Sequence, residues 1–216
     1  MILFIISILC AYLLGSVPSA VWISKIFYNI DIREHGSGNA GTANTFRVLG
    51  AKAGIPVFII DVLKGTLAVL LSFLFFNKDI YGLNFIEIKL ILGLSALVGH
   101  IFPVFANFKG GKGVATLLGV MLIIQPLPTL CSLATFIIIL LTFRYVSLSS
   151  ILSGVSFPFY LIFIFKSDNI SLISFSILIA LILLITHHKN IKRLLEGEEP
   201  KVKIFRGNKN NNNTNL

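Results

Sequence analysis

Charged residues are scarce in this sequence. Only 12% of its 216 residues are Asp, Glu, Lys or Arg, whereas 56% are apolar. Soluble domains carry charge at about a quarter of their positions and interrupt their apolar runs often. Here the apolar residues form long runs, which argues against a soluble domain and indicates an integral membrane protein.

Carboxylates and cysteines are also few. Nine acidic residues stand against 18 basic ones, for a net charge of +9. Before the C-terminal tail, the side where the basic residues gather has only Asp31, Glu34 and Asp61, too few for a Mg²⁺ site built from several carboxylates. Cys10 and Cys131 lie in apolar runs and are interpreted as small hydrophobic residues, neither a disulfide nor a metal pair. No metal or other cofactor is expected.

Apolar windows long enough to cross a bilayer recur along the chain. A hydrocarbon core about 30 Å thick needs about 20 helical residues. Five windows are clear, at 1–24, 53–76, 90–108, 148–165 and 170–186. The stretch 113–143 is split by Pro126 and Pro128, which predicts two short helices joined by a turn, with one kinked helix as the alternative. Within the second window, Asp61 and Lys64 are expected to neutralise each other.

The distribution of basic residues decides between seven spans and six, because Lys and Arg collect in cytoplasmic loops. With seven spans, one side holds Lys25, Arg33, Arg47, Lys52, Lys109, Lys112, Arg144 and the tail from Lys189, and the other holds only Lys78, Lys89 and Lys166. Six spans would destroy this asymmetry. We therefore predict an all-α integral membrane protein with seven transmembrane helices, the N-terminus outside and the C-terminus cytoplasmic.

Both terminal regions need an interpretation of their own. The first window has no basic segment before it and further membrane segments behind it, so we expect it to be retained rather than cleaved as a signal peptide. Residues 207–216 are Asn-rich with nothing to bury, and they are predicted to be disordered. Without an internal repeat or a soluble segment, residues 1–206 are predicted to form one membrane domain.

A first polar cluster spans residues 35–50, which read HGSGNAGTANTFRVLG. Four glycines allow backbone amides to turn toward one anion. Arg47, at the start of a predicted helix, could clamp phosphate oxygens with its planar fork. The alternative is an ordinary glycine-rich connector, and the terminal Lys-Ser or Lys-Thr of a nucleotide-binding P-loop is missing. The candidate ligands are Ser37, Asn39, Asn44 and Arg47.

A second cluster spans residues 99–116, which read GHIFPVFANFKGGKGVAT. Lys109 and Lys112 are separated only by glycines, and a helix is predicted to begin directly after them. Cations at a helix N-terminus oppose the helix dipole, so an anion between them explains their position better than helix stability does. Positive-inside topology alone would account for the lysines, but not for the glycines or for His100.

Two further clusters lie at the same predicted membrane face. In 144–150, RYVSLSS, Ser147 and Ser150 would share one side of a helical turn, although serines at a helix start are usually caps. In 187–199, HHKNIKRLLEGEE, polar side chains recur every three residues as the last span ends: His187, Asn190 and Arg193. A solvated basic helix end would look similar. Together the four clusters predict a phosphate site facing the cytoplasm.

These motifs resemble the acyl-phosphate-dependent glycerol-3-phosphate acyltransferases of bacterial inner membranes, over nearly the whole chain. SGNAGTAN with Arg47, GHIFPVFANFKGGKGVAT, and the run from His187 to Glu199 match three family motifs in their order, and RYVSLSS matches a serine-containing segment between them. Two positions depart from the family pattern. Ala43 stands where a hydroxyl is usual, and His188 stands where arginine is common.

The resemblance implies a seven-helix fold in the bacterial inner membrane, acyl phosphate and glycerol 3-phosphate as substrates, and lysophosphatidic acid as product. It implies no metal, no cofactor, no nucleic acid partner and no dedicated protein base. The candidate catalytic residues are His100, Lys109, His187 and Asn190. The candidate substrate-binding residues are Ser37, Asn39, Asn44, Arg47, Lys112 and Ser147.

Two other classes of membrane protein compete with this interpretation. A transporter of phosphorylated solutes would carry polar residues at the midplane and on the outer side, and the predicted spans lack them apart from Asp61 and Lys64. A metal-dependent lipid head-group transferase would carry clustered aspartates, which the sequence lacks. The residues alone support a membrane protein with a cytoplasmic phosphate site. The acyl group and the glycerol come from the resemblance.

Overall fold

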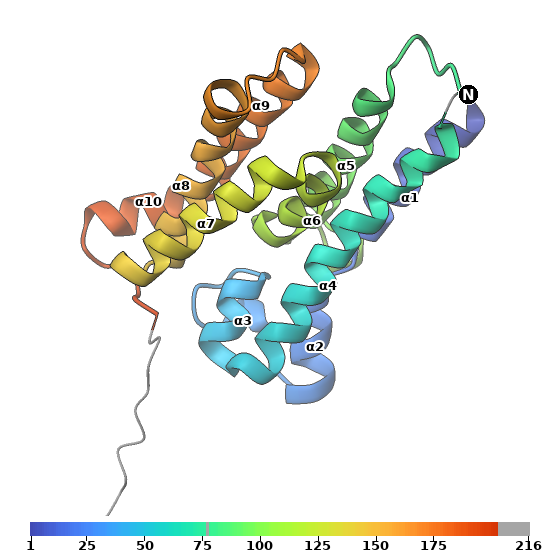
Figure 1. The fold of residues 1–216 in the computed structure, drawn as a ribbon. Coiled ribbons are helices and arrows are strands. Elements are labelled where there is room, and N and C mark those ends of the chain that lie inside the picture. The colour runs from blue at the N-terminus through green and yellow to red at the C-terminus, as the bar shows by residue number, and fades with distance from the viewer. Residues whose placement is uncertain (77, 203–216) are drawn as a thin grey trace, which may run out of the picture.

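The computed structural model describes residues 1–76 and 78–202 (Figure 1). In these ranges every regular element is helical, and the only β-type pairing is an isolated bridge between Ile80 and Leu83. The predicted all-α class is therefore confirmed. The segment 207–216, predicted to be disordered, lies outside the described residues.

The α-helices follow one another along the described ranges and are joined by short connections. They are α1 (Ile2–Ser16), α2 (Ser19–Tyr28), α3 (Thr42–Leu49), α4 (Ala51–Leu70), α5 (Phe85–Ile101), α6 (Val114–Ile124), α7 (Pro126–Phe143), α8 (Val146–Phe159), α9 (Ile170–Thr186) and α10 (His188–Leu195). The 3-10 segments are Ile32–Glu34, Leu71–Phe75 and Val104–Ala106, and a π-helical turn at Tyr160–Ile164 extends α8.

Four helical segments are long and apolar enough to cross a bilayer, by length and composition: Ala51–Phe75, Phe85–Ala106, Pro126–Phe143 and Val146–Ile164. The pairs α1 with α2 and α9 with α10 are bent by 40° and 61°, and the number in the described ranges rises to six if each pair forms one span. Helix α6 has 11 residues. Its length of about 16 Å is too short by itself for a hydrocarbon core about 30 Å thick.

Prolines set the breaks between helices. Pro126 and Pro128 occupy the first turn of α7, directly after the end of α6. Proline has no N–H to continue a helix, and its ring crowds the preceding turn. The stretch 113–143 therefore forms two helices, as predicted, although α7 with 18 residues is longer than expected. Pro18 separates α1 from α2, where the sequence predicts one continuous span over 1–24.

Glycines let helices approach closely in the first half of the chain, where α1 packs on α5 and α4 packs on α6. A Cβ on Gly15 would overlap the carbonyl oxygen of Ala96, and a Cβ on Gly119 would overlap that of Val62. Between membrane helices, small residues permit the close backbone packing that drives association. Figure 1 shows α1, α4 and α5 on one side, α7, α8 and α9 on the other, and α6 between them.

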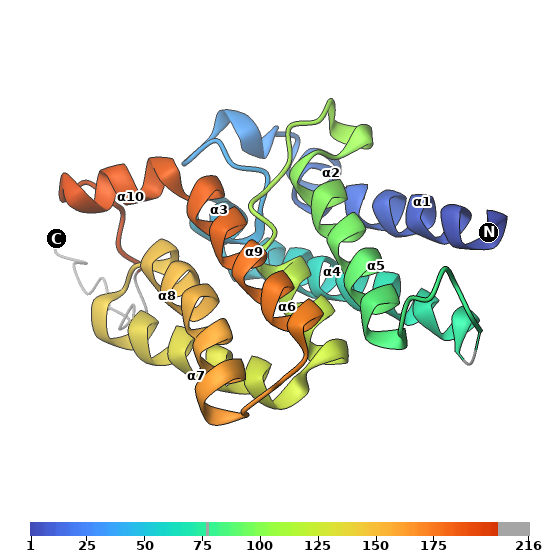
Figure 2. The ribbon, with the colours of Figure 1, turned by 90° about the horizontal axis from the view of Figure 1, so that it is seen from above.

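The polar connections collect at the end of the bundle opposite the start of α1 (Figure 2). There Arg33 Nη1 donates to the carbonyl of Ala106 at 3.1 Å, and the N–H of Val202 donates to the carbonyl of Arg144 at 2.8 Å. The segments at this end are the connections 29–41, 102–113 and 144–145, together with α10 and the residues that follow it up to 202. The four polar clusters of the sequence thus lie at one end.

Candidate functional site

Asn44 shapes the glycine-rich loop that precedes α3. Its side-chain amide donates to the carbonyls of Ile32 at 3.0 Å and His35 at 2.9 Å, and its oxygen accepts the N–H of Ser37 at 2.8 Å. These bonds hold a turn in which Gly36 has φ of +63°, a conformation that favours glycine. The buried Asn44 side chain is therefore engaged within the loop.

The other predicted ligands of the first cluster are more accessible than Asn44. Ser37 and Arg47 are exposed, and Asn39 is half-buried. The prediction that Arg47 starts a helix is wrong, because α3 already begins at Thr42 and Arg47 lies in its last turn. This places the guanidinium near Lys112, where its charge helps to lower the pKa of that lysine.

The turn at 109–113 folds back onto the end of α5. The N–H of Gly110 donates to the carbonyl of Ile101, and the N–H of Gly111 donates to that of His100, both at 3.2 Å. A Cβ on Gly110 would overlap the His100 carbonyl oxygen, so a side chain there would require a shift. A Cβ on Gly111 would lie 3.1 Å from the carbonyl oxygen of Ala40, so the first and second clusters touch. As predicted, α6 begins directly after this turn.

Glu199 joins the remaining clusters. Its Oε1 accepts hydrogen bonds from Ser147 Oγ at 2.8 Å and Asn190 Nδ2 at 2.7 Å, and its Oε2 accepts one from Arg193 Nε at 2.8 Å. Lys112 Nζ donates to Asn190 Oδ1. The carboxylate is only 5% exposed. Side chains from the 109–113 turn, α8 and α10 thus form one connected group.

This group carries net positive charge. Burial lowers the pKa of Lys112 to about 8, Glu199 opposes this effect, and Arg193 and Arg47 add to it. Burial would raise the pKa of Glu199, but hydrogen bonds from its three partners outweigh that effect and hold the pKa below its usual value. Two cations, Lys112 and Arg193, thus lie near one carboxylate, and the charge of Arg47 also acts on Lys112. Such a site attracts anions.

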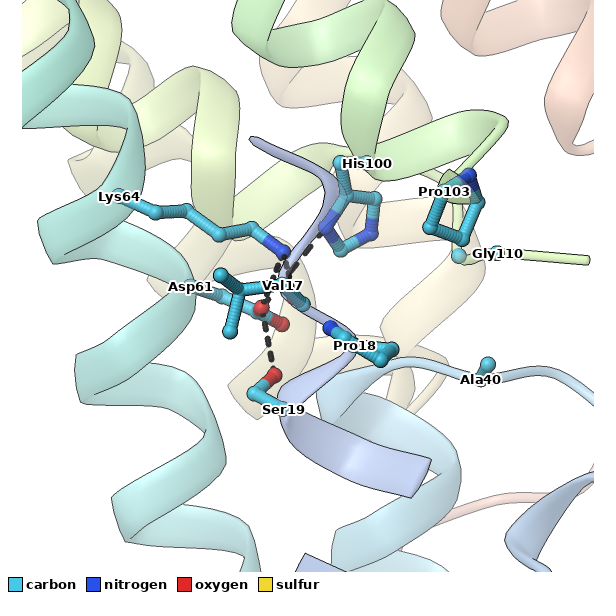
Figure 3. A pocket seen from close by; sticks show the side chains of 10 residues that line it. Val17, Pro18, Ser19, Ala40, Asp61, Lys64, His100, Pro103 and Gly110 are labelled. Carbon is cyan, nitrogen blue, oxygen red and sulfur yellow. Dashed lines mark hydrogen bonds and ion pairs between the residues drawn. The ribbon is translucent and has the colours of Figure 1, made fainter. Parts of the chain in front are cut away.

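A second polar network lies deeper, around Asp61 and His100 (Figure 3). Asp61 Oδ1 accepts a hydrogen bond from Ser19 Oγ at 2.7 Å and lies 2.9 Å from Lys64 Nζ. The predicted mutual neutralisation of Asp61 and Lys64 is confirmed. Thr116 Oγ1 lies 3.0 Å from His100 Nδ1, and the histidine is 6% exposed. A small pocket lies between this network and the 109–113 turn, and its lining includes Asp61, Lys64, His100, Gly110 and Gly111.

His187 and Lys109 have different surroundings. His187 is buried at the bend between α9 and α10, where its Nδ1–H donates to the carbonyl of Leu183 at 2.8 Å. Lys109 is exposed, and no partner for its ammonium group lies within the described residues. The structure therefore brings Lys112, Ser147 and Asn190 into one hydrogen-bonded group and leaves Lys109 outside it.

Glu199 and Arg193 lie in the motif that runs from His187 to Glu199, but neither is among the predicted site residues. Ser19 and Thr116 are also not among the predicted site residues; Ser19 lies in no motif, whereas Thr116 is the last residue of the second cluster. Glu199 lies 52 residues from Ser147 along the chain, so no local spacing indicates their hydrogen bond. The signal for Glu199 in the sequence was the position of this acidic residue after the basic end of the last predicted helix.

The fold and this site define the class of protein. The chain belongs to the glycerol-3-phosphate acyltransferase family, whose sequence profile matches residues 5–197. The resemblance seen in the motifs is thus confirmed as membership of the glycerol-3-phosphate acyltransferase family.

Among particular relatives, the chain is 40% identical over 227 aligned residues to glycerol-3-phosphate acyltransferase of Chlorobium phaeobacteroides (strain BS1), with 93% of this chain and 97% of that protein covered. It is 48% identical to the enzyme of the same name from Geobacillus kaustophilus (strain HTA426), with 91% and 94% covered. The crystal structure of PlsY (YgiH), an integral membrane glycerol 3-phosphate acyltransferase, in its glycerol 3-phosphate form matches with a TM-score of 0.82 at 37% identity, covering 92% and 95%.

Proposed function

We propose that this protein transfers the acyl group of an acyl phosphate to glycerol 3-phosphate and forms 1-acyl-glycerol 3-phosphate, which is lysophosphatidic acid. The observation that carries this proposal is the joining of Lys112, Ser147, Asn190 and Arg193 around one buried carboxylate, next to Arg47. Membership of the family supports it. So does the likeness to a protein solved in glycerol 3-phosphate and lysophosphatidic acid forms.

Both proposed substrates carry phosphate, and the site offers two neighbouring places for it. Arg47, Ser37 and Asn39 border the glycine-rich loop, and Lys109 and Lys112 border the 109–113 turn. Guanidinium and ammonium groups bind phosphate oxygens through charge-assisted hydrogen bonds. Helix α6 begins just after the turn, and its N-terminal amides and dipole also favour an anion.

The protein does not need to activate the acyl group, because acyl phosphate is already an activated mixed anhydride. The glycerol oxygen bonds to the acyl carbon, the bond from that carbon to the phosphate oxygen breaks, and phosphate leaves with the electron pair. The protein's part is to position both substrates and to stabilise charge on the carbonyl oxygen and leaving phosphate. We assign this part to His100, Lys109, His187 and Asn190, with Asn44 and Ser147 lining the site.

A substrate phosphate takes the hydroxyl proton in this proposal. Glu199 is a poor base, because three donors hold its carboxylate and its pKa lies below the usual value. Asp61 is paired with Lys64 and bonded to Ser19. Both acids near the site are therefore already occupied, and neither a metal nor a cofactor is assigned a role.

We further propose that residues 1–206 form a single membrane domain with seven membrane helices. In this arrangement α6, although short, crosses as the seventh span beside six others, two of which are the bent pairs. The N-terminus is outside, the C-terminus is cytoplasmic, and the site faces the cytoplasm from the bacterial inner membrane. The basic connections at one end of the bundle support this orientation.

The test is direct. Purified protein in detergent is supplied with palmitoyl phosphate and labelled glycerol 3-phosphate, with a metal chelator present and without coenzyme A. We expect labelled lysophosphatidic acid and free phosphate in equal amounts. Folded protein that makes no product would exclude the proposed reaction. Product from palmitoyl-coenzyme A, but not from palmitoyl phosphate, would contradict the assignment of the donor.

A further inference from the structure

Asp61 lies in the middle of α4, is 1% exposed, and connects this helix to two others. Its Oδ1 accepts from Ser19 Oγ at 2.7 Å, and its Oδ2 accepts from Thr42 Oγ1 at 3.1 Å. Ser19 is the first residue of α2, and Thr42 is the first residue of α3. One carboxylate therefore fixes the starting points of two helices, including the one that follows the glycine-rich loop.

Lys64 extends the network to the bend between α1 and α2. Its Nζ lies 2.9 Å from Asp61 Oδ1 and donates to the carbonyl of Val17 at 2.9 Å. That carbonyl precedes Pro18, which has no N–H and interrupts the helical ladder. Lys64 thus supplies a hydrogen bond to the bend while its charge is balanced by Asp61.

His100 connects the same carboxylate to the 109–113 turn. Its Nδ1 lies 3.7 Å from Asp61 Oδ1 and 3.0 Å from Thr116 Oγ1. The opposite ring nitrogen, Nε2, faces Gly111, where an added Cβ would overlap it. Figure 3 shows the imidazole between the Asp61 and Lys64 pair and the Pro103 and Gly110 side of the pocket. The ring is thus packed between the Asp61 carboxylate and the 109–113 turn.

A buried ion pair is a weak source of stability, because desolvation offsets its attraction and apolar replacements are often tolerated. An apolar pair, however, cannot form the directed hydrogen bonds that Asp61 and Lys64 form. We propose that Asp61 is a positioning residue, which sets the loop 35–41 and the turn 109–113 relative to one another so that phosphate groups meet both. This inference rests on the proposed function, since it assigns the two segments to substrate phosphates.

The main test replaces the whole pair with apolar residues, in Asp61→Leu with Lys64→Met, so that no unpaired charge is left buried. A single substitution, Thr42→Val, removes one hydrogen bond without changing side-chain shape. For each variant we measure melting in detergent, kcat, and KM for both substrates. The matched control is Lys192→Gln with Glu196→Gln, an exposed pair at the C-terminal end of α10 in which Lys192 Nζ lies 3.8 Å from Glu196 Oε1.

We expect the apolar pair to fold and to raise the KM of at least one substrate about tenfold or more, the effect of losing about one to two hydrogen bonds. Thr42→Val should raise the same KM by a smaller factor, and the control should change neither constant. A purely structural role would reduce kcat through lost folded protein and leave KM unchanged. That result, in either the apolar pair or Thr42→Val, would overturn the proposal.

Binding of glycerol 3-phosphate, measured by calorimetry without the acyl donor, separates the two proposals. If the native protein binds it but makes no lysophosphatidic acid, the reaction is wrong, and weaker binding by the Asp61 variants would still support positioning. If the variants bind it as tightly as the native protein, positioning is wrong whatever the reaction. A native protein that binds neither glycerol 3-phosphate nor inorganic phosphate would overturn both proposals.

Discussion

At the scale of single residues, Glu199 is a buried charge whose hydrogen bonds all come from the candidate site. Its donors are Ser147, Asn190 and Arg193. A neutral amide would keep the shape of the carboxylate but place an NH₂ group against at least one of these donors. Hydrogen bonds to charged groups contribute about 1.5 to 3 kcal/mol each.

We expect Glu199→Gln to lower the free energy of unfolding by about 2 kcal/mol and to reduce kcat/KM about tenfold or more. Thermal melting in detergent and initial rates of acyl transfer measure the two effects. Glu198→Gln is the control, because Glu198 is the exposed neighbour of the same charge. Equal behaviour of the two variants would show that Glu199 does not organise the site.

Lys112 makes the site sensitive to pH. Burial lowers its pKa to about 8. Its ammonium group is therefore charged below this pH and loses its proton as the pH rises through it. The second pKa of a phosphate monoester is about 6, so the substrate stays doubly charged in this window.

We expect the KM for glycerol 3-phosphate to rise as the pH passes about 8, since the neutral amine attracts phosphate less. A series of KM measurements across this range checks the direction. In Lys112→Arg the cation persists at every pH used, so this rise should disappear even if binding is weaker. A rise of the same size in Lys112→Arg would assign the titration to another group.

The sequence indicated that basic and polar residues gather at one end of the molecule, but not which of these residues pair. Lys112 and Asn190 are 78 residues apart, so only the fold shows that they meet. The structure also shows the surroundings of Ala43, which stands where the family pattern usually has a hydroxyl. Ala43 is exposed at the start of α3, whereas the hydroxyl of Thr42 reaches Asp61. The neighbouring threonine is thus the one engaged in the interior.

At the scale of elements, hydropathy located most helices but misplaced some of their ends. Residues 170–186 form α9 with the predicted bounds. By contrast, α5 begins at Phe85, five residues before the predicted window 90–108. Asn84 and Glu87 form a capping box there, and Lys89 Nζ lies 4.6 Å from the ring centre of Phe85. Capping and cation–π contacts allow charged residues in a first turn, which an average over hydropathy does not register.

Close packing of α1 on α5 depends on Gly99, where an added Cβ would overlap the carbonyl oxygen of Tyr12. That neighbour is backbone and cannot rotate away, so the two helices must separate. We expect Gly99→Val to lower the free energy of unfolding by about 3 kcal/mol, at the upper end of overpacking costs. Thermal melting in detergent measures it.

Gly82→Ala is the matched control, because Gly82 lies shortly before α5 and a Cβ there meets no atom within 4 Å, although its φ of +70° adds local strain. Its loss of stability should stay within about 1 kcal/mol, the ordinary cost of a backbone conformation that favours glycine. If Gly99→Val melted like Gly82→Ala, the two helices would not be in backbone contact.

At the scale of the whole molecule, the number of membrane crossings stays a prediction. Seven crossings place Lys78 and Lys166 outside and Lys189 and Lys201 inside, whereas six would move Lys166 and both later lysines to the opposite sides. Single cysteines at these positions, in a background with Cys10 and Cys131 replaced by Ala, distinguish the two arrangements.

In intact cells, a membrane-impermeant maleimide should label the cysteines at 78 and 166, and should label those at 189 and 201 only after permeabilisation. The physical reason is that the basic connections gather at one end of the bundle, and such segments stay on the cytoplasmic side. Labelling of position 201 from outside would reject seven crossings. Labelling at 78 serves as the positive control, since both arrangements place it outside.

The late position of Glu199 in the chain also determines when its hydrogen bonds can form during synthesis. A ribosome synthesises the chain from its N-terminus, so Lys112 and Ser147 are made well before residue 199. Asn190 and Arg193 follow, and their shared acceptor comes after all of the described helices. The hydrogen-bonded group around Glu199 therefore forms late in biogenesis, when the residues that follow α10 fold back onto α8.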